Sequence, residues 1–466
     1  MKKRFYILLL LFKACTPALA QSSISISAFG VFGNGTDEGP KIQLAITQAR
    51  LQGYDAVVME SGGTYGTNRQ IIMPSGLTLN GVQAQLKALP NFPVGNRAII
   101  TTAAIATLAR SVSITVDSNS YTFQYTDFDH PVIAGRIIEI SGPKYATYHG
   151  EDYYKGWQSR VVSVVGTTVT MEHPAMQAFT STSIKQYQTT TNVCVMNLHI
   201  IQPKKTGGGG TCGGLEYAVN SSFVNCIFES DVNGGATFGF NGISCINSKV
   251  DHCLAWKIDM VKQGYAMSFT GQNDSINYSK VLKSRSGIIT GGRYYIYTVH
   301  YWRDTTYTQG AGSQLDLHGN AQGSMTECVA FMDNPNNFPL HGFQPRGMNT
   351  RVEGNTTYTN GNGGAAASAS AIFVFENGYK NMVIQNNTTV YQFTKPYDVA
   401  ISKELGGPQV NFVNGNNTVV QGVIPPLPLP TLPGYAIDQT PVVIPPVVQP
   451  EDTTDCFLVP FSKYNQ

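Results

Sequence analysis

The chain has 466 residues, and its 31 Lys and Arg nearly balance its 29 Asp and Glu. A formal charge of +2 supplies no basic surface for nucleic acid, which binds through many contacts between cations and phosphate. Charged residues make up only 13% of the chain, while Gly and Tyr are abundant. This composition favours a turn-rich β protein over a helical one.

Residues 1–20 have the pattern of a secretion signal peptide. Three basic residues, Lys2–Arg4, precede the apolar run Ile7–Phe12, and Ala18–Ala20 has the small-x-small form of a cleavage site. The apolar run is too short to span a bilayer. We therefore expect secretion to the periplasm or the extracellular space. Removing the four basic residues of this segment leaves 27 of the 31, so the mature charge is −2.

The cysteines do not form a predicted disulfide framework. The chain has eight, and removal of Cys15 with the signal leaves seven, which cannot all pair within one chain. No CxxC or HxxxH spacing suggests zinc. We expect buried thiols, an accessible Cys212 in the glycine-rich "TGGGGTCGG", and neither a metal nor another cofactor.

The segment 21–111 begins with a predicted helix. Asp37 can cap a helix that starts near Gly39, with Pro40 in its first turn. Ile42, Ile46 and Ala49 then fall on one face, at i, i+4 and i+7. The rest of this segment is expected to form the first coils of the architecture described below.

Residues 112–187 interrupt the coil pattern with longer strands and hairpin-like turns, which predicts an antiparallel β insertion. Its segment "YATYHGEDYYKGW" contains Tyr153, Tyr154 and Trp157. Aromatic rings can stack on sugar faces, so these residues are candidates for substrate binding. The alternative is that they form a small local core beneath the insertion.

Residues 188–422 contain a repeat. Short apolar-alternating strands return to one Asn, Cys or Ser at positions spaced by 29, 27, 26, 49, 27 and 32 residues, and these positions are Asn197, Cys226, Cys253, Ser279, Cys328, Asn355 and Asn387. The spacing of 49 fits two turns. Such a pattern predicts stacked coils about 4.8 Å apart, a parallel β-solenoid. An antiparallel sandwich would instead show hairpin signals every 8–12 residues.

The predicted helix and the tail belong to the two ends of this solenoid. An open solenoid end exposes unpaired strand edges, and the helix at Gly39 covers one of them. Residues 423–466 are rich in Pro and cannot form a regular strand or helix. We expect this segment to be an extended strap along the coils or a tail.

A second row of strands, "AMSFTG", "QLDLHG", "FQPRG" and "FVFENG", precedes the ladder positions by about ten residues. Alternation gives its apolar residues one direction, and they are Phe269, Leu317, Pro345 and Phe375. Their polar neighbours then face outward in a column, and they are Ser268, Thr270, Asp316, His318, Gln344, Arg346 and Glu376. In a chain poor in charge this column indicates a catalytic or binding face, with a stabilising polar stack as the alternative.

From this column we assign roles. The candidate catalytic residues are Asp316, His318, Arg346 and Glu376. The candidate substrate-binding residues, beyond the insertion aromatics, are Arg293, Gln344, Tyr294, Tyr295, His341 and Glu216. Arg293 enters by counting 23 residues from Thr270 and 25 to His318. His341, in a second "LHG", is alternatively a stacked turn residue.

The stretch "AFGVFGNGTDEGPKIQLAITQA" followed by "DAVVMESGGTYGTNRQIIMPSGLTLNGV" resembles the entry module of the pectate-lyase-like right-handed β-helix superfamily, with Glu38 where the second Asp of that pattern is usual. Polygalacturonases, polysaccharide lyases and phage tailspikes share this fold. The resemblance implies an all-β, right-handed parallel β-helix with an N-terminal capping helix, into which the antiparallel subdomain is inserted. It does not imply one reaction.

The motifs of three subfamilies of this fold are matched by the sequence only in part or not at all. "HGNAQGS" is similar to an element of polygalacturonases, but the paired aspartates expected one coil earlier are replaced by "GGRYYIYTVHYW". "LDLHGN" resembles a segment of alginate and chondroitin lyases, with Leu317 where they have Arg. The clustered aspartates of calcium-dependent pectate lyases are absent from the sequence.

Three functions follow as hypotheses. The first is a secreted lyase that cleaves a uronate-containing polysaccharide, in which Arg346, Arg293 or Gln344 neutralises the carboxylate, His318 or Arg346 is the base, and Tyr294 or Tyr295 the acid. The second is an inverting hydrolase, since Asp316 and Glu376 lie two coils apart, about 9.6 Å. The third is a glycan-binding spike or adhesin, including a tailspike-type receptor-binding protein, which would be a trimer if spike-like.

Overall fold

The computed structural model describes residues 23–425 outside sixteen short gaps, and the gaps are 94–97, 104, 149–150, 203–209, 231–235, 259–264, 285, 291–296, 309–311, 321, 333–339, 348, 360–369, 376–380, 393–396 and 403–411. The predicted signal peptide and most of the Pro-rich segment lie outside the described residues. No helix in the described part is long and apolar enough to cross a membrane.

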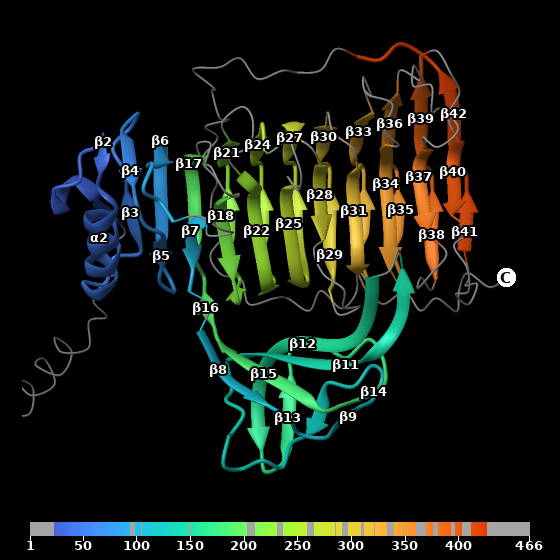
Figure 1. Ribbon diagram of the computed structural model, residues 1–466, viewed down its shortest axis with the longest axis horizontal. Helices are drawn as coiled ribbons and strands as arrows, with labels where there is room; N and C mark the ends of the chain where they lie inside the picture. Colours follow the sequence, from blue (N-terminus) through green and yellow to red (C-terminus); the bar gives the residue numbers. More distant parts are fainter. Residues whose placement is uncertain are drawn as a thin grey trace, which may run out of the picture. The chain divides into compact units, whose positions relative to one another are not determined.

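Stacked coils form a parallel β-solenoid of about 11 turns (Figure 1). Each full coil contributes strands to three faces, which we number in the order in which the chain passes through them. Face 1 contains β1 (Ile24–Ser25), β3 (Ala56–Val58), β20 (Ser222–Val224), β23 (Lys249–Asp251), β26 (Asp274–Asn277), β29 (Val299–Trp302), β32 (Ser324–Thr326), β35 (Arg351–Glu353), β38 (Met382–Gln385) and β41 (Phe412–Gly415).

Face 2 contains β2 (Asn34–Asp37), β4 (Thr64–Thr67), β21 (Ile227–Ser230), β24 (Leu254–Trp256), β27 (Lys280–Ser284), β30 (Thr305–Thr308), β33 (Val329–Met332), β36 (Thr356–Thr359), β39 (Thr388–Tyr391) and β42 (Thr418–Gln421). The longer β6 (Thr78–Ala88) and β17 (Cys194–Gln202) run through faces 1 and 2.

Face 3 contains β5 (Ile71–Met73), β7 (Ala98–Thr102), β18 (Gly210–Glu216), β22 (Ala236–Ile246), β25 (Tyr265–Gln272), β28 (Ser286–Thr290), β31 (Gly312–Asn320), β34 (Leu340–Gly347), β37 (Ser370–Phe375) and β40 (Tyr397–Ser402). The predicted second row of strands is confirmed as part of this face. The short β16 (Thr190–Thr191) and β19 (Ala218–Val219) pair beside it.

The predicted capping helix is α2 (Gly39–Leu51), which follows the 3-10 turn η1 (Ile26–Phe29). Ile42, Ile46 and Ala49 are all fully buried, as the spacing predicts. Asp37 accepts a hydrogen bond from the Gly39 N–H at 3.2 Å and another from Asn68 Nδ2 at 2.9 Å. The side chain therefore joins the start of the helix to the first coils.

A buried column of side chains at the corner between faces 1 and 2 joins successive coils. Each member accepts a hydrogen bond from the backbone N–H of the previous member: Cys253 Sγ from Cys226 (3.4 Å), Ser279 Oγ from Cys253 (3.2 Å) and Asp304 Oδ1 from Ser279 (2.8 Å). Asp304 occupies the column in the coil between Ser279 and Cys328, which accounts for the spacing of 49 residues. The predicted ladder is confirmed at these positions.

The column continues with amide side chains. Asn355 Oδ1 accepts from the Cys328 N–H at 2.8 Å, and Asn387 Oδ1 accepts from the Asn355 N–H at 3.0 Å. Asn355 Nδ2 also donates to the Met325 carbonyl at 2.9 Å. The amide thus satisfies two backbone groups, as the Ser279 hydroxyl does by accepting from Cys253 and donating to the Asn277 carbonyl at 3.0 Å.

The prediction for Asn197 is wrong by one residue. The pairings Met196 with Val224 and His199 with Ile227 place it opposite Asn225, whose Nδ2 donates to its Oδ1 at 2.9 Å. Both asparagines have a left-handed backbone, with φ of 54° and 56°, a conformation that Asn tolerates well. Sequence counting mistook this corner position for the buried one beside it.

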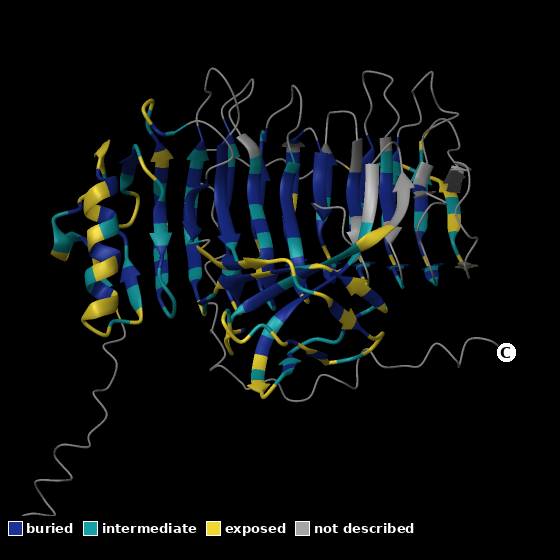
Figure 2. Cartoon of the chain, turned by 60° about the horizontal axis from the view of Figure 1, so that its bottom comes forward, coloured by how far each residue is buried: buried dark blue, intermediate teal, exposed yellow. Residues whose placement is uncertain are grey.

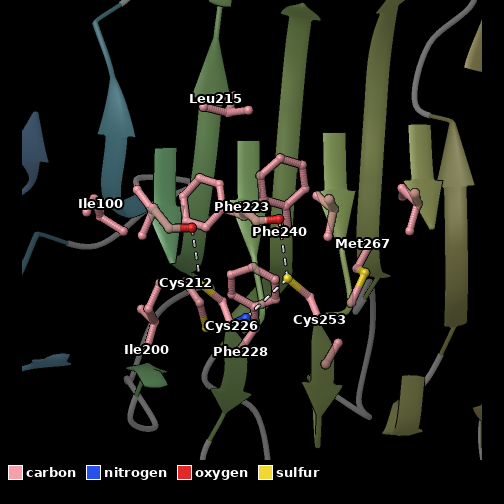
Figure 3. Packing of buried hydrophobic residues seen from close by; sticks show 14 of the residues in the cluster. Ile100, Ile200, Cys212, Leu215, Phe223, Cys226, Phe228, Phe240, Cys253 and Met267 are labelled. Carbon is pink, nitrogen blue, oxygen red and sulfur yellow. Dashed lines mark hydrogen bonds between the residues drawn. The ribbon is translucent and has the colours of Figure 1, made fainter. Parts of the chain in front are cut away.

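Five of the six described cysteines are buried in the apolar core, and Cys194 is of intermediate exposure. Figure 3 shows Cys226 and Cys253 among packed rings that include Phe223 and Phe240, whose centroids are 5.2 Å apart. The cysteines described by the structure are all free, and they are Cys194, Cys212, Cys226, Cys245, Cys253 and Cys328. The expectation of an accessible Cys212 is wrong, because this side chain is fully buried and its Sγ donates to the Glu229 carbonyl.

The inserted antiparallel subdomain is confirmed, and its strands begin at β8 (Ile105–Arg110) and end at β15 (Ser183–Gln188). Between them lie β9 (Ile114–Val116), β10 (Thr122–Gln124), β11 (Ile137–Tyr148), β12 (Glu151–Val165), β13 (Thr168–Met171) and β14 (Phe179–Ser181). β11 and β12 form a long hairpin, in which β11 also pairs with β15 and β12 also pairs with β13. A core separate from that of the coils holds the insertion together.

Replacement of Asp304 by Asn should stabilise the protein at neutral pH. Burial raises the pKa of the Asp304 carboxyl well above its ordinary value, so the folded state holds a proton that the unfolded state releases. The stability of the wild type therefore falls as the pH rises from the pKa of the Asp304 carboxyl in the unfolded state toward its pKa in the folded state. In urea titrations, the advantage of Asp304→Asn should grow by about 1.4 kcal/mol per pH unit over that range.

Asn355→Asp is the matched reverse substitution in the same column. It should lose stability as pH rises, because it buries a carboxyl where the amide Nδ2 now donates to Met325. Identical pH profiles for wild type and Asp304→Asn would show that Asp304 is ionised in the folded protein and would contradict the prediction.

Thiol labelling should report the packing of the core. Burial raises the pKa of the Cys212, Cys253 and Cys328 thiols, which suppresses the reactive thiolate. We expect these three to react with a maleimide only after denaturation, while the less buried Cys194 reacts first among the described cysteines. Mass spectrometry of labelled peptides would identify each site, and rapid native labelling of Cys212 would contradict its observed position.

Candidate functional site

The outer side of face 3 brings together polar residues of β31 and β34. Leu315, Leu317 and Phe343 are at most 1% exposed and point into the core, so strand alternation directs Asp316 and Gln344 outward. These two residues are register partners on adjacent strands. Both residues are buried, with 5% and 4% of their surface exposed.

His318 and Arg346 are the next outward positions of the same two strands. They are also register partners, two residues after Asp316 and Gln344. Strand geometry therefore separates the four backbone positions by about 4.8 Å across the strands and about 6.6 Å along them. The side chains of His318 and Arg346 lie outside what the structure describes. We call Asp316, His318, Gln344 and Arg346 the face 3 quartet.

Two outward columns extend from the quartet toward earlier coils. In the first column, Asn241 pairs with Ser268, Ser268 with Ile289, and Ile289 with Asp316. In the second column, Glu216 pairs with Ile243 and Ile243 with Thr270. Glu216 therefore shares the column of Thr270, as its predicted place requires. Partial burial raises the pKa of its carboxyl above the ordinary value.

The register in this coil is described up to the pair of Phe269 with Thr290, where β28 ends. The predicted place of Arg293 beside Thr270 stays a prediction. The residues Arg293, Tyr294, Tyr295 and Glu376 lie outside the described part of the chain. His341 pairs with Ser313 near the start of β31, away from His318 near the end of that strand.

Trp157 is not available for sugar stacking. Its side chain is 1% exposed and its ring meets Phe123 edge-to-face at 5.8 Å. The indole Nε1 donates to the His173 carbonyl at 3.0 Å. The alternative reading, a local core, is therefore correct for Trp157. Tyr154 lies on the same strand and is half-buried, and the structure does not describe the side chain of Tyr153.

A polar junction between the insertion and face 3 was not predicted. Ser244 Oγ donates to Glu139 Oε1 of β11, and the Ser244 N–H donates to Thr270 Oγ1 at 3.1 Å. Tyr187 of β15 stacks on Tyr217 with ring centroids 3.7 Å apart. Burial raises the pKa of both phenols, that of Tyr187 to about 12. Ser244 thus links Thr270 of the outward column to Glu139 of the insertion.

A second polar contact joins the insertion to these coils beside the long hairpin β11–β12, which we call the arm. Arg160 of β12 pairs with Glu172 at 2.9 Å, and Asn247 Nδ2 donates to Glu172 Oε1 at 3.4 Å. β12 lies against β22 and β25 of face 3. Figure 2 shows the strands of the insertion passing across the strands of the coils. The arm therefore forms a wall beside the outward columns.

The described residues do not contain a group of three or more His, Cys, Asp or Glu side chains that could hold a metal ion. The functional groups identified above are instead carboxylates, amides, hydroxyls and one candidate His–Arg pair. Such groups bind sugar hydroxyls and carboxylates and can exchange protons with them.

No protein-family model and no curated protein matches the sequence. Several solved structures have a similar fold. The tailspike gp49 of Pseudomonas phage LKA1 aligns over 86% of this chain and 76% of its own, with 15% identity and a TM-score of 0.58. The Gp54 tailspike of Acinetobacter baumannii bacteriophage AP22 aligns over 86% and 72%, with 14% identity and a TM-score of 0.56.

A tailspike variant of E. coli bacteriophage HK620 aligns over 85% of this chain and 67% of its own, with 10% identity and a TM-score of 0.50. The chain has a right-handed parallel β-helix fold. At these identities the likeness establishes the fold of this β-helix and no reaction.

Trp157→Ala should destabilise the insertion. Removing a buried indole from a close-packed core costs about 3–5 kcal/mol. We expect urea unfolding of the insertion at lower concentration and faster proteolysis within residues 112–187. Val162→Ala on the same strand is the control, because that side chain is 55% exposed and its loss should be nearly neutral. Unchanged stability in Trp157→Ala would contradict the packing described here.

Proposed function

We propose that this β-helix binds a polysaccharide along the outer side of face 3 and cleaves it by β-elimination at the face 3 quartet. The observation that supports this is the register, which brings Asp316 beside Gln344 and His318 beside Arg346 on neighbouring strands. In a chain with 13% charged residues, such a set on one surface is selective for a polar, acidic ligand.

The proposed reaction divides among these residues. Arg346 neutralises the carboxylate of a uronate and Gln344 donates a hydrogen bond to it, which acidifies the proton on the neighbouring carbon. His318 removes that proton, and its electron pair forms the new carbon–carbon double bond as the bond to the glycosidic oxygen breaks. The leaving oxygen takes up one proton. Tyr294 and Tyr295 remain the proposed acids of this last step.

Hydrolysis is less well supported. A glycoside hydrolase needs two carboxyl groups about 5–5.5 Å or 6.5–9.5 Å apart. Glu216 and Asp316 are the carboxyl residues identified in the described outward columns, and the four strand spacings between them correspond to roughly 19 Å. Glu376 is the remaining candidate partner and lies outside the described residues.

Two neighbours in fold support a carbohydrate ligand. The AP22 tailspike was solved with a capsular saccharide and the HK620 variant with a pentasaccharide. A protein that meets such polymers acts outside the cytoplasm, in agreement with the predicted signal peptide. We therefore propose a secreted protein whose partner is a polysaccharide.

Recognition without cleavage is the second candidate function. The burial of Asp316 and Gln344, at 5% and 4% exposure, favours it because a catalytic group must reach the scissile bond. In this reading the two side chains form a structural polar stack, and the glycan contacts their neighbours.

The mechanism predicts specific losses of activity. His318→Ala and Arg346→Ala should each lower turnover about 10²-fold or more, the usual effect of losing a general acid or base. Stability should change little, since outward residues leave the core intact. Thr305→Ala, at an outward position of face 2, is the control and should retain full activity.

The products distinguish the alternatives. Elimination creates an unsaturated uronate that absorbs ultraviolet light, whereas hydrolysis yields new reducing ends without that absorbance. Reducing ends alone, lost in Asp316→Asn, would replace elimination by hydrolysis. Binding of a polysaccharide without any cleavage would establish the recognition function.

A further inference from the structure

A second surface with chemistry suited to sugars lies at the corner between faces 1 and 2. We define the corner strip as His252, Tyr278, Trp302, Arg303 and Glu327, which come from four successive coils. It lies on a different side of the coils from the outward columns of face 3. Neither the proposed reaction nor the junction uses these residues.

The backbone of this corner is specialised. Every coil turns here through a left-handed residue, and in the flanking coils that residue is Asn225, Gly354, Asn386 or Asn416. Asn and Gly tolerate the conformation well. The same left-handed conformation occurs at φ of 50–56° in Tyr278, Arg303 and Glu327. It costs free energy in residues with larger side chains. Exposed aromatic and charged side chains thus replace the regular Asn stack in these coils.

The side chains of the strip hold one another in place. His252 stacks on Tyr278 with ring centroids 4.8 Å apart and planes inclined by 15°. Trp302 meets Tyr278 edge-to-face at 4.8 Å. The Arg303 guanidinium lies 4.8 Å from the Trp302 centroid and pairs with Glu327 at 2.6 Å. Trp302 is therefore an oriented ring beside a fixed cation and carboxylate.

This ring is open to solvent. Trp302 is 37% exposed, whereas the other two tryptophans of the chain, Trp157 and Trp256, are 1% and 5% exposed. The side chains of Arg303 and Glu327 are each 48% exposed. A large apolar ring flanked by accessible donors and acceptors matches a pyranose, which offers an apolar face and a rim of hydroxyl groups.

We propose that the corner strip is a second carbohydrate-binding site, in which a sugar ring packs on Trp302 and its hydroxyls bond to Arg303 and Glu327. The Arg303–Glu327, Lys249–Asp251 and Arg351–Glu353 ion pairs neutralise the charges of this region. Recognition is therefore by shape and hydroxyl groups, and binding depends weakly on salt. Only the polysaccharide class of the ligand rests on the proposed function.

Tryptophan fluorescence tests the site directly, because Trp302 is the tryptophan that a solvent quencher reaches. The full-length protein would be titrated with acrylamide in the presence of dextran, xylan, alginate or polygalacturonate. We expect one fluorescence component to be quenched in the free protein, and at least one of these glycans to protect it. Trp302→Phe should remove that component.

Trp302→Ala should weaken binding of the protecting glycan about tenfold while leaving stability almost unchanged. Phe32→Ala is the matched control, since Phe32 is an aromatic residue 65% exposed outside the strip. His318→Ala should lose cleavage and keep the protection of Trp302, which separates the two sites.

The result that overturns this inference alone is a glycan that the wild type binds or cleaves without protecting Trp302, and that Trp302→Ala binds with unchanged affinity. A structural role for the strip would also overturn the inference. It would be shown by a large loss of stability in Trp302→Ala, together with retained glycan binding by Trp302→Phe and no glycan protection of Trp302 in the wild type. Failure of every glycan to bind the wild type would overturn both this inference and the proposed function.

Discussion

The later part of the solenoid, from the coil of Cys226 onward, depends on one constraint: a coil must present a side-chain acceptor to the buried N–H group of the coil before it. An unsatisfied buried N–H costs free energy comparable to a lost hydrogen bond. Thiol, hydroxyl, carboxyl and amide groups all meet this requirement, at Cys253, Ser279, Asp304 and Asn355. The residue type can therefore change along the column while the register of the coils is kept.

A fixed register aligns the outside of the solenoid as well as the inside. Once Cys328 and Asn355 are superposed in the core, Asp316 must lie beside Gln344 on face 3. The same stacking places Tyr278 beside Trp302 at the corner between faces 1 and 2. Functional groups distant in sequence thus become neighbours without any loop designed to bring them together.

The sequence predicts those features that recur with the coil. The helix face of Ile42 and the buried Cys226 follow from periodicity alone, and both are observed. Counting fails where neighbouring positions look alike. Asn197 is misplaced by one residue because a left-handed corner residue resembles the buried residue beside it.

Features formed across the insertion could not be predicted in this way. Glu139 and Ser244 are 105 residues apart and share no repeat. Aromatic composition also leaves two outcomes open, since Trp157 suits a sugar platform and a local core equally well. Burial separates the two cases, because Trp157 is enclosed by its own subdomain while Trp302 is exposed at a coil corner.

The insertion leaves the solenoid without disturbing its stacking. β18 pairs with both β7 and β22, and β17 pairs with both β6 and β20, so the coils before and after the insertion are direct neighbours. The insertion then returns to the coils through Glu139 and through the stack of Tyr187 on Tyr217. Because these contacts are partly buried, they hold the insertion beside the coil that contains Thr270. The wall of the candidate site and its floor therefore rest on two separate hydrophobic cores, and substitutions within the core of the insertion can alter the wall while the register of face 3 is kept.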